Sequence, residues 1–308
     1  MTQKADHPPP GRPVPCDTRA MSTSPLILTA PAKLNLFLHI TGRRGDGYHN
    51  LQTIFQLLDI GDELTFASRQ DGEVTLSVRG PQVLTDLRDE DNLVLRAARL
   101  LRSHAGGDRP GADITLHKVL PTGGGLGGGS SDAATTLLAL NHLWQLHCSR
   151  DELAELGRQL GADVPVFVRG RSAWAEGIGE QLTPLELPPR WYLVLHPGVG
   201  IATKTIFSHP QLTRDTPAIT IAAFFEGASR NDCQPLVRRL AADVDNALIW
   251  LDKFGEARMT GTGASVFTAF ANEADAKAVQ AMVPDEWQSF VARGLNHSPV
   301  TEQLDATN

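Results

Sequence analysis

Six of the seven residues from Gly123 to Gly129 are glycines, and this run constrains the fold more than any other part of the chain. Glycine loses more conformational freedom on folding than other residues, so a fold keeps such a run where the backbone must bend sharply or approach another group closely. The alternation of residues 113–118 predicts a strand before the run, and the apolar spacing of residues 133–144 predicts a helix after it. A glycine loop at a helix start offers free N–H groups and a positive dipole end, which together favour a phosphate site.

Two common phosphate motifs fit this run poorly. A P-loop needs a lysine directly before Ser130, and a glycine stands there. The dinucleotide fingerprint matches formally through Gly123, Gly125 and Gly128, but it requires a strand with an acidic end about 20 residues further on. Residues 149–152 (Ser-Arg-Asp-Glu) instead predict a capping box that opens another helix. A flexible linker is a third alternative, which the close placement between a strand and an apolar helix disfavours.

Composition and charge narrow the classes of partner. The formal net charge of −7 argues against general nucleic-acid binding. Cys16, Cys148 and Cys233 form neither a disulfide framework nor a zinc pattern, which suits the reducing cytoplasm. The longest apolar run, residues 191–195, is too short to span a membrane. We therefore expect a cytoplasmic protein that binds small molecules and neither nucleic acid nor membrane. We also expect a monomer or weak homodimer, which these compositional features do not determine.

The segment Pro121-Thr-Gly-Gly-Gly-Leu-Gly-Gly-Gly-Ser-Ser-Asp-Ala-Ala134 resembles the phosphate loop of the galactose, homoserine, mevalonate and phosphomevalonate (GHMP) kinases. Its long form resembles one branch, the 4-diphosphocytidyl-2-C-methyl-D-erythritol kinases of the methylerythritol phosphate route to isoprenoids. Further motifs extend the resemblance over roughly residues 26–300. It implies an α+β fold in two domains: an N-terminal domain with a left-handed βαβ crossover and a C-terminal ferredoxin-like domain. It also implies ATP, Mg²⁺ and a cytidyl-diphosphate substrate phosphorylated on its 2-hydroxyl.

We expect four segments along the chain. Residues 1–24 are rich in proline and predict a disordered leader, and ordered chain should begin near Leu26. Residues 25–188 would form the ATP-binding domain, and residues 189–300 the C-terminal kinase domain, with residues 301–308 as a disordered tail.

The predicted scaffold includes a hairpin turn and two helices. Asp71-Gly72 is typical of a hairpin turn, and Asp91 or Asn92 of a cap for a helix through residues 93–101. The apolar spacing of residues 236–248 predicts one amphipathic helix, whereas residues 208–230 predict little.

Lys33 and Asp163 are the predicted catalytic residues. From alternation alone, Lys33 and Asn35 would lie on the exposed face of a strand; Pro31-Ala-Lys-Leu-Asn35 resembles the opening motif of the branch, where both line the active site. Pro165 favours an extended Val164, which would hold Asp163 on a short corner, either as a structural group or as a partly dry base. Gly161-Ala-Asp-Val-Pro165 resembles the catalytic aspartate segment, which implies that Asp163 accepts the hydroxyl proton and Lys33 orients it.

The resemblance also implies binding residues. Tyr48 and His49 would receive cytosine, with Phe207 stacking opposite Tyr48 and Thr203 near the transferred group. The second glycine turn, with Gly261, Thr262 and Gly263, would lie against the phosphate loop. The implied phosphate-binding residues are Lys118, Pro121, Gly123, Gly124, Gly125, Leu126, Gly127, Gly128, Gly129, Ser130 and Ser131. Sister kinases hold magnesium with a glutamate that has no counterpart here, so the phosphates would bind it, with Ser130 or Ser131 as alternatives for a protein ligand.

Other functions stay open from the sequence. A sister kinase for homoserine or a mevalonate-type alcohol is disfavoured by the long glycine loop and Tyr48-His49. A non-catalytic nucleotide sensor would have no need of Asp163, and a dinucleotide oxidoreductase lacks the acidic strand end.

Overall fold

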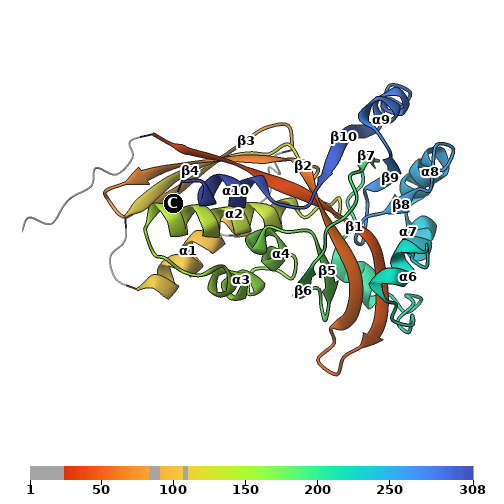
Figure 1. The fold of residues 1–308 in the computed structure, drawn as a ribbon, viewed down its shortest axis with the longest axis horizontal. Coiled ribbons are helices and arrows are strands. Elements are labelled where there is room, and N and C mark those ends of the chain that lie inside the picture. The colour runs from red at the N-terminus through yellow and green to blue at the C-terminus, as the bar shows by residue number, and fades with distance from the viewer. Residues whose placement is uncertain (1–23, 83–90, 107–109, 308) are drawn as a thin grey trace, which may run out of the picture.

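The computed structural model describes residues 24–82, 91–106 and 110–307. The predicted leader therefore lies outside the described residues except for Ser24, and the first strand starts at Leu26, as expected. Figure 1 shows two α+β units side by side, joined by one long antiparallel hairpin that passes along both. This hairpin consists of β1 (Leu26–Arg43) and β2 (His49–Arg69).

The first unit is built on a mixed sheet. Strand β4 (Gly111–His117) lies between β2 and β3 (Val74–Arg79), antiparallel to the former and parallel to the latter. Asp71-Gly72 is thus a turn but not a hairpin turn, because β4 separates the two strands that it joins. Helix α1 (Leu93–Ala105), capped by the Asn92 side chain as expected, connects the parallel pair β3 and β4. The handedness of this crossover stays a prediction.

The helices that precede the second unit in the chain lie on one side of this sheet (Figure 1). They are α1, α2 (Gly128–Leu143), α3 (Arg150–Arg158) and α4 (Val164–Arg169). Helix α2 lies deepest: Ala133, Ala134 and Leu137 are fully buried in the main core. The predicted capping box at Ser149 and Glu152 is present at the start of α3.

The second unit confirms the ferredoxin-like prediction. Its four strands are β7 (Trp191–His196), β8 (Arg258–Met259), β9 (Val266–Phe270) and β10 (Gln288–Leu295). Their order in the sheet is β10-β7-β9-β8, which is fourth, first, third, second, and all pairs are antiparallel. A short hairpin of β5 (Ala173–Glu176) and β6 (Gln181–Pro184) pairs with β2 and precedes this unit.

The helices of the second unit include a break that the sequence did not reveal. They are α5 (Thr203–Ser208), α6 (Ile221–Phe225), α7 (Gln234–Leu240), α8 (Ala242–Leu251) and α9 (Glu273–Gln280). The single helix predicted over residues 236–248 is divided into α7 and α8 because Ala241 has extended backbone, with φ −135° and ψ 96°.

The end of the chain returns to the first unit. Residues 301–307 were expected to belong to a disordered tail, but Pro299–Asp305 form helix α10, which packs on β1 and α2. Val300 and Leu304, spaced one helical turn apart, are buried there, and Pro299 occupies the first turn, where its missing N–H is harmless. Strand β10 also pairs with β2 at Gly294, so the two sheets are continuous. The boundary at residue 189 stays a prediction.

Candidate active site

A cavity of about 730 Å³ opens where the two units meet. The glycine loop, residues 121–129, lines it together with Lys33, Asn35 and Asp163 of the first unit. Phe207, Thr203 and the turn at Gly261 and Thr262 line it from the second unit. Most of the predicted site residues thus share one cavity, although they come from segments far apart in the sequence.

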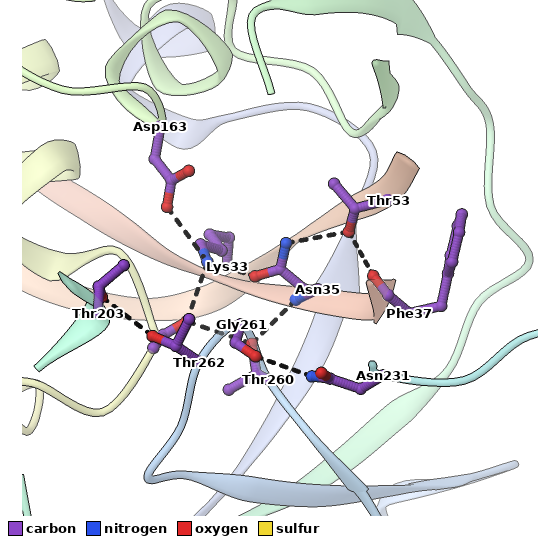
Figure 2. Close-up of polar contacts among 11 residues, drawn as sticks. Lys33, Asn35, Phe37, Thr53, Asp163, Thr203, Asn231, Thr260, Gly261 and Thr262 are labelled. Carbon is purple, nitrogen blue, oxygen red and sulfur yellow. Dashed lines mark hydrogen bonds and ion pairs between the residues drawn. The ribbon is translucent and has the colours of Figure 1, made fainter. Parts of the chain in front are cut away.

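Lys33 lies at the centre of the polar contacts in this cavity (Figure 2). Its side chain is only 3% exposed, so the surface alternative for this strand was wrong. The Nζ atom donates to Asn35 Oδ1 at 2.5 Å and to the Gly125 carbonyl at 2.9 Å, and lies 3.3 Å from Asp163 Oδ2. The register of β1 shifts between Pro31 and Lys33, where the Lys33 N–H donates to the Leu126 carbonyl at 3.0 Å. At this irregularity both the backbone of β1 and the Lys33 side chain are hydrogen-bonded to the glycine loop.

Asp163 stands at the N-cap of α4, with about a third of its side chain exposed. The predicted extended corner was wrong: Val164 and Pro165 belong to the first helical turn, where proline is well tolerated. The carboxylate points toward Lys33 and contacts its ammonium (Figure 2). The Asp163 carboxylate is therefore accessible from the cavity and paired with a buried cation.

The glycine loop alternates between ordinary and left-handed backbone. Gly123, Gly125 and Gly127 have φ near +70°, a conformation that favours glycine. Helix α2 then begins at Gly128, five residues earlier than expected and still within the glycine run. The first N–H groups of the helix have no partner within it, so they are available to an anion.

The second glycine turn lies against this loop, as predicted. The Ser265 N–H donates to the Gly124 carbonyl at 3.1 Å, and the Thr260 hydroxyl donates to the Gly125 carbonyl at 3.2 Å. A Cβ atom on Gly125 would lie 2.4 Å from the Thr260 carbonyl oxygen, which no side chain could tolerate. The two backbones therefore touch at a position that only glycine allows.

Asn231 was not recognised from the sequence. Its buried side-chain amide donates to the carbonyls of Met259 at 2.7 Å and Gly261 at 2.8 Å, which fixes the second glycine turn. Thr262, in the same turn, shares a hydrogen bond of 3.0 Å with Thr203. The only sequence signal was a polar residue before a helix start, which is ordinary for a cap.

Lys118, which was predicted to bind phosphate, has two carboxylate partners within the protein. Its Nζ atom lies 2.5 Å from Asp62 Oδ2 and 2.9 Å from Asp132 Oδ2, and both carboxylates are buried. Asp62 Oδ1 also accepts the N–H groups of Val119 and Leu120. Burial raises the pKa of Asp132 to about 7, against the opposing effect of Lys118. Lys118 still lines the cavity, so direct contact with phosphate stays a prediction.

The predicted cytosine residues are only partly brought together. The His49 ring is buried and stacks on Phe207, with 5.2 Å between centroids and 29° between planes. Tyr48 is 61% exposed. Within the described part of the chain, Phe207 lines the cavity, whereas Tyr48 and His49 are not among its lining residues. The position of Tyr48 opposite Phe207 stays a prediction.

The acidic groups near the loop already have cationic partners: Asp62 and Asp132 pair with Lys118, and Asp163 pairs with Lys33. Within the described ranges, no three His, Cys, Asp or Glu side chains gather as a metal cluster. Of the two serines considered for magnesium, Ser130 lines the cavity, whereas Ser131 is fully buried. The same ranges contain no helix suited to cross a bilayer.

The fold and the site together define the class of protein, which is a small-molecule kinase of the GHMP class. The glycine loop begins a helix, the ferredoxin-like unit packs against that loop, and a lysine–aspartate pair lies in the cavity beside it. Residues 92–171 match the family model described as GHMP kinases N terminal domain, and residues 213–289 match GHMP kinases C terminal. Within that superfamily, the chain belongs to the 4-diphosphocytidyl-2-C-methyl-D-erythritol kinase family.

The relatives match over nearly their full length. The 4-diphosphocytidyl-2-C-methyl-D-erythritol kinase of Pseudomonas aeruginosa (strain UCBPP-PA14) is 59% identical over 91% of this chain and 98% of its own. A crystal structure of 4-(cytidine 5'-diphospho)-2C-methyl-D-erythritol kinase superposes with a TM-score of 0.75 at 32% identity, covering 87% of this chain and 99% of that one. A mevalonate kinase structure, at 16% identity and a TM-score of 0.65 over 88% and 100% of the two chains, shares the fold.

Proposed function

We propose that this protein is an ATP-dependent kinase that phosphorylates the 2-hydroxyl of 4-diphosphocytidyl-2-C-methyl-D-erythritol, giving the 2-phosphate and ADP. This reaction belongs to the methylerythritol phosphate route to isoprenoid precursors. The observation that carries the proposal is the position of Lys33, whose ammonium contacts both the Asp163 carboxylate and the Gly125 carbonyl of the phosphate loop. The names and identity of the relatives support the choice of substrate.

Asp163 is the proposed proton acceptor. Phosphoryl transfer to an alcohol depends mainly on positioning and on charge stabilisation, with a group to take the hydroxyl proton. As the substrate oxygen bonds to the γ-phosphorus, the bond from phosphorus to the ADP oxygen breaks and the proton passes to the Asp163 carboxylate. Asn35 fixes the position of the Lys33 ammonium, so Lys33 can orient the Asp163 carboxylate. The positive charge of Lys33 also offsets negative charge beside the loop.

The first unit would hold ATP. The glycine loop and the start of α2 present N–H groups to the phosphates. Apolar side chains of β3, β4 and α1 line the cavity on that unit and would receive the adenine; they are Leu76, Val78, Leu93 and Leu116. Magnesium, when bound, would neutralise phosphate charge, with Ser130 as the cavity-lining hydroxyl that would hold it.

The alternatives are weaker for specific reasons. A sensor does not explain a base paired with a buried lysine beside the phosphate loop. A dinucleotide oxidoreductase is disfavoured because residues 149–152 form a helix cap and not an acidic strand end. We also propose a cytoplasmic location, in keeping with the three widely spaced cysteines, and a monomer or weak homodimer.

The test is ADP release from ATP and magnesium with three alcohols: the cytidyl-methylerythritol substrate, homoserine and mevalonate. Turnover with the cytidyl substrate alone would support the proposal. Turnover with a control alcohol instead would keep the Asp163 mechanism but reject the substrate. A protein that binds ATP and turns over none of the three would favour the sensor.

A further inference from the structure

Arg214 lies in the segment after α5 from which the sequence predicted little, and its guanidinium makes four hydrogen bonds. Its Nε atom donates to His49 Nε2 at 3.0 Å. Its two terminal nitrogens donate to backbone carbonyls: Nη1 to Leu212 at 3.0 Å, and Nη2 to Phe207 at 3.0 Å and His209 at 2.7 Å. One side chain therefore joins the start of β2 in the hairpin to the end of α5 in the second unit.

The bond to His49 determines where the imidazole proton lies. A guanidinium is always a donor, so His49 Nε2 must accept and its ring must be neutral with the proton on Nδ1. Burial lowers the pKa of His49, and the charges of Arg214 and then Arg43 lower it further, which agrees with a neutral ring. The fixed tautomer leaves an N–H donor on the other edge of the imidazole.

The same guanidinium also sets the aromatic contact of His49. It holds the Phe207 carbonyl while the Phe207 ring stacks on His49, at 29° between planes. Phe207 lines the active-site cavity. Arg214, His49 and Phe207 therefore form one connected unit. Contacts of this kind within the protein reduce the ordering that a ligand must supply.

We propose that Arg214 is a positioning residue for the nucleobase of the substrate: it holds His49 as the neutral Nδ1–H tautomer against Phe207. A pyrimidine with ring acceptors, such as cytosine with its N3 and O2 atoms, would then meet a preset donor and an aromatic face. This inference rests on the proposed function for the identity of the base, but the tautomer of His49 can be measured without substrate.

The kinetic test compares Arg214→Gln with wild type. A lost positioning bond should raise KM for the cytidyl substrate about tenfold, with little change in kcat or in KM for ATP. Arg214→Lys, which keeps one donor and the charge, should recover part of the loss. Arg43→Gln is the matched control, because it removes a charge that lowers the His49 pKa but leaves the Arg214 bond in place. Unchanged KM in both Arg214 variants would overturn the proposal.

The spectroscopic test uses nitrogen-15 NMR of the histidine rings, with His49 assigned from the missing signal of His49→Gln. Wild type should show the Nδ1–H tautomer of His49. Arg214→Gln should show both neutral tautomers of His49, and the pKa of the His49 ring should move up toward about 6.5. An Nε2–H tautomer in wild type would overturn the proposal even if KM changes. If wild type fails to turn over the cytidyl substrate, the proposed function fails, and the tautomer alone decides the role of Arg214.

Discussion

The ammonium of Lys118 lies 2.9 Å from Oδ2 of Asp132, and this ion pair joins the strand before the glycine loop to the helix after it. Asp62 of β2 is the third charged group of this cluster. It binds the same ammonium and accepts the N–H groups of Val119 and Leu120. Both ends of the phosphate loop are thus held by one buried cluster of charges.

Lys118→Met should therefore destabilise the fold. Removing one partner from a buried ion pair leaves charge without compensation, at a cost of about 3–5 kcal/mol. Denaturant unfolding measures the difference. Lys277→Met is the control, since Lys277 pairs with Glu273 on an exposed helix surface, and such pairs contribute at most about 1 kcal/mol. Equal losses in the two variants would contradict a structural role for the cluster.

Asp132 should make stability depend on pH. Its pKa is raised from 3.8 to about 7 by burial, so between those values the folded protein keeps a proton that the unfolded chain has lost. Its contribution to the free energy of unfolding therefore falls as pH rises from about 4 to about 7, by at most roughly 1.4 kcal/mol per pH unit. Asp132→Asn lacks this titration, so its stability relative to wild type should rise over the same window and then level off. A difference that stays flat with pH would contradict this account.

Gly125→Ala should damage the site more than Gly123→Ala. Both glycines have φ near +70°, so both variants bear about 1–2 kcal/mol of backbone strain. Only at Gly125 would the new Cβ meet backbone, 2.4 Å from the Thr260 carbonyl oxygen; at Gly123 the nearest atom lies 3.7 Å away. A misplaced loop can cost about a hundredfold in rate, so kcat/KM should fall by that order only in Gly125→Ala. Similar kinetics in the two variants would contradict the role of the loop junction.

The motifs allowed much of this site to be predicted, because each of them is local in the sequence. The helix caps at Asn92 and Ser149 were also local, and both are present. The features that the sequence did not predict depend on contacts between segments that are far apart in the chain. Asp62 binds Lys118 from 56 positions away, and no local sequence pattern indicates this contact.

The same holds for the rest of what the sequence missed. Arg214 acts through carbonyls of its own segment and a histidine far along the chain, and such bonds leave no motif. Alternation of apolar and polar residues predicts strands but not their order in a sheet. It could therefore not show that β4 lies between β2 and β3. Helix α10 was missed because its two buried apolar residues are too few to give a clear period.

Tyr48→Ala should weaken binding of the cytidyl substrate without weakening the fold. The side chain is 61% exposed, so it contributes little to packing. If it stacks on the base, its removal should cost about 1–3 kcal/mol of binding and raise KM for this substrate alone. Tyr48→Phe, which keeps the ring, should behave as wild type. An unchanged KM in Tyr48→Ala would remove Tyr48 from the base site.

In the proposed mechanism Asp163, held by Lys33, takes the proton from the substrate hydroxyl. This role is tested by steady-state ADP release of Asp163→Asn with the cytidyl substrate, together with calorimetric binding of ATP. Asp151→Asn, an exposed carboxylate on α3, is the control. We expect kcat of Asp163→Asn to fall by about a hundredfold to ten-thousandfold while ATP affinity stays near that of wild type. A kcat close to wild type would contradict the assigned role of Asp163 and, with it, the mechanism.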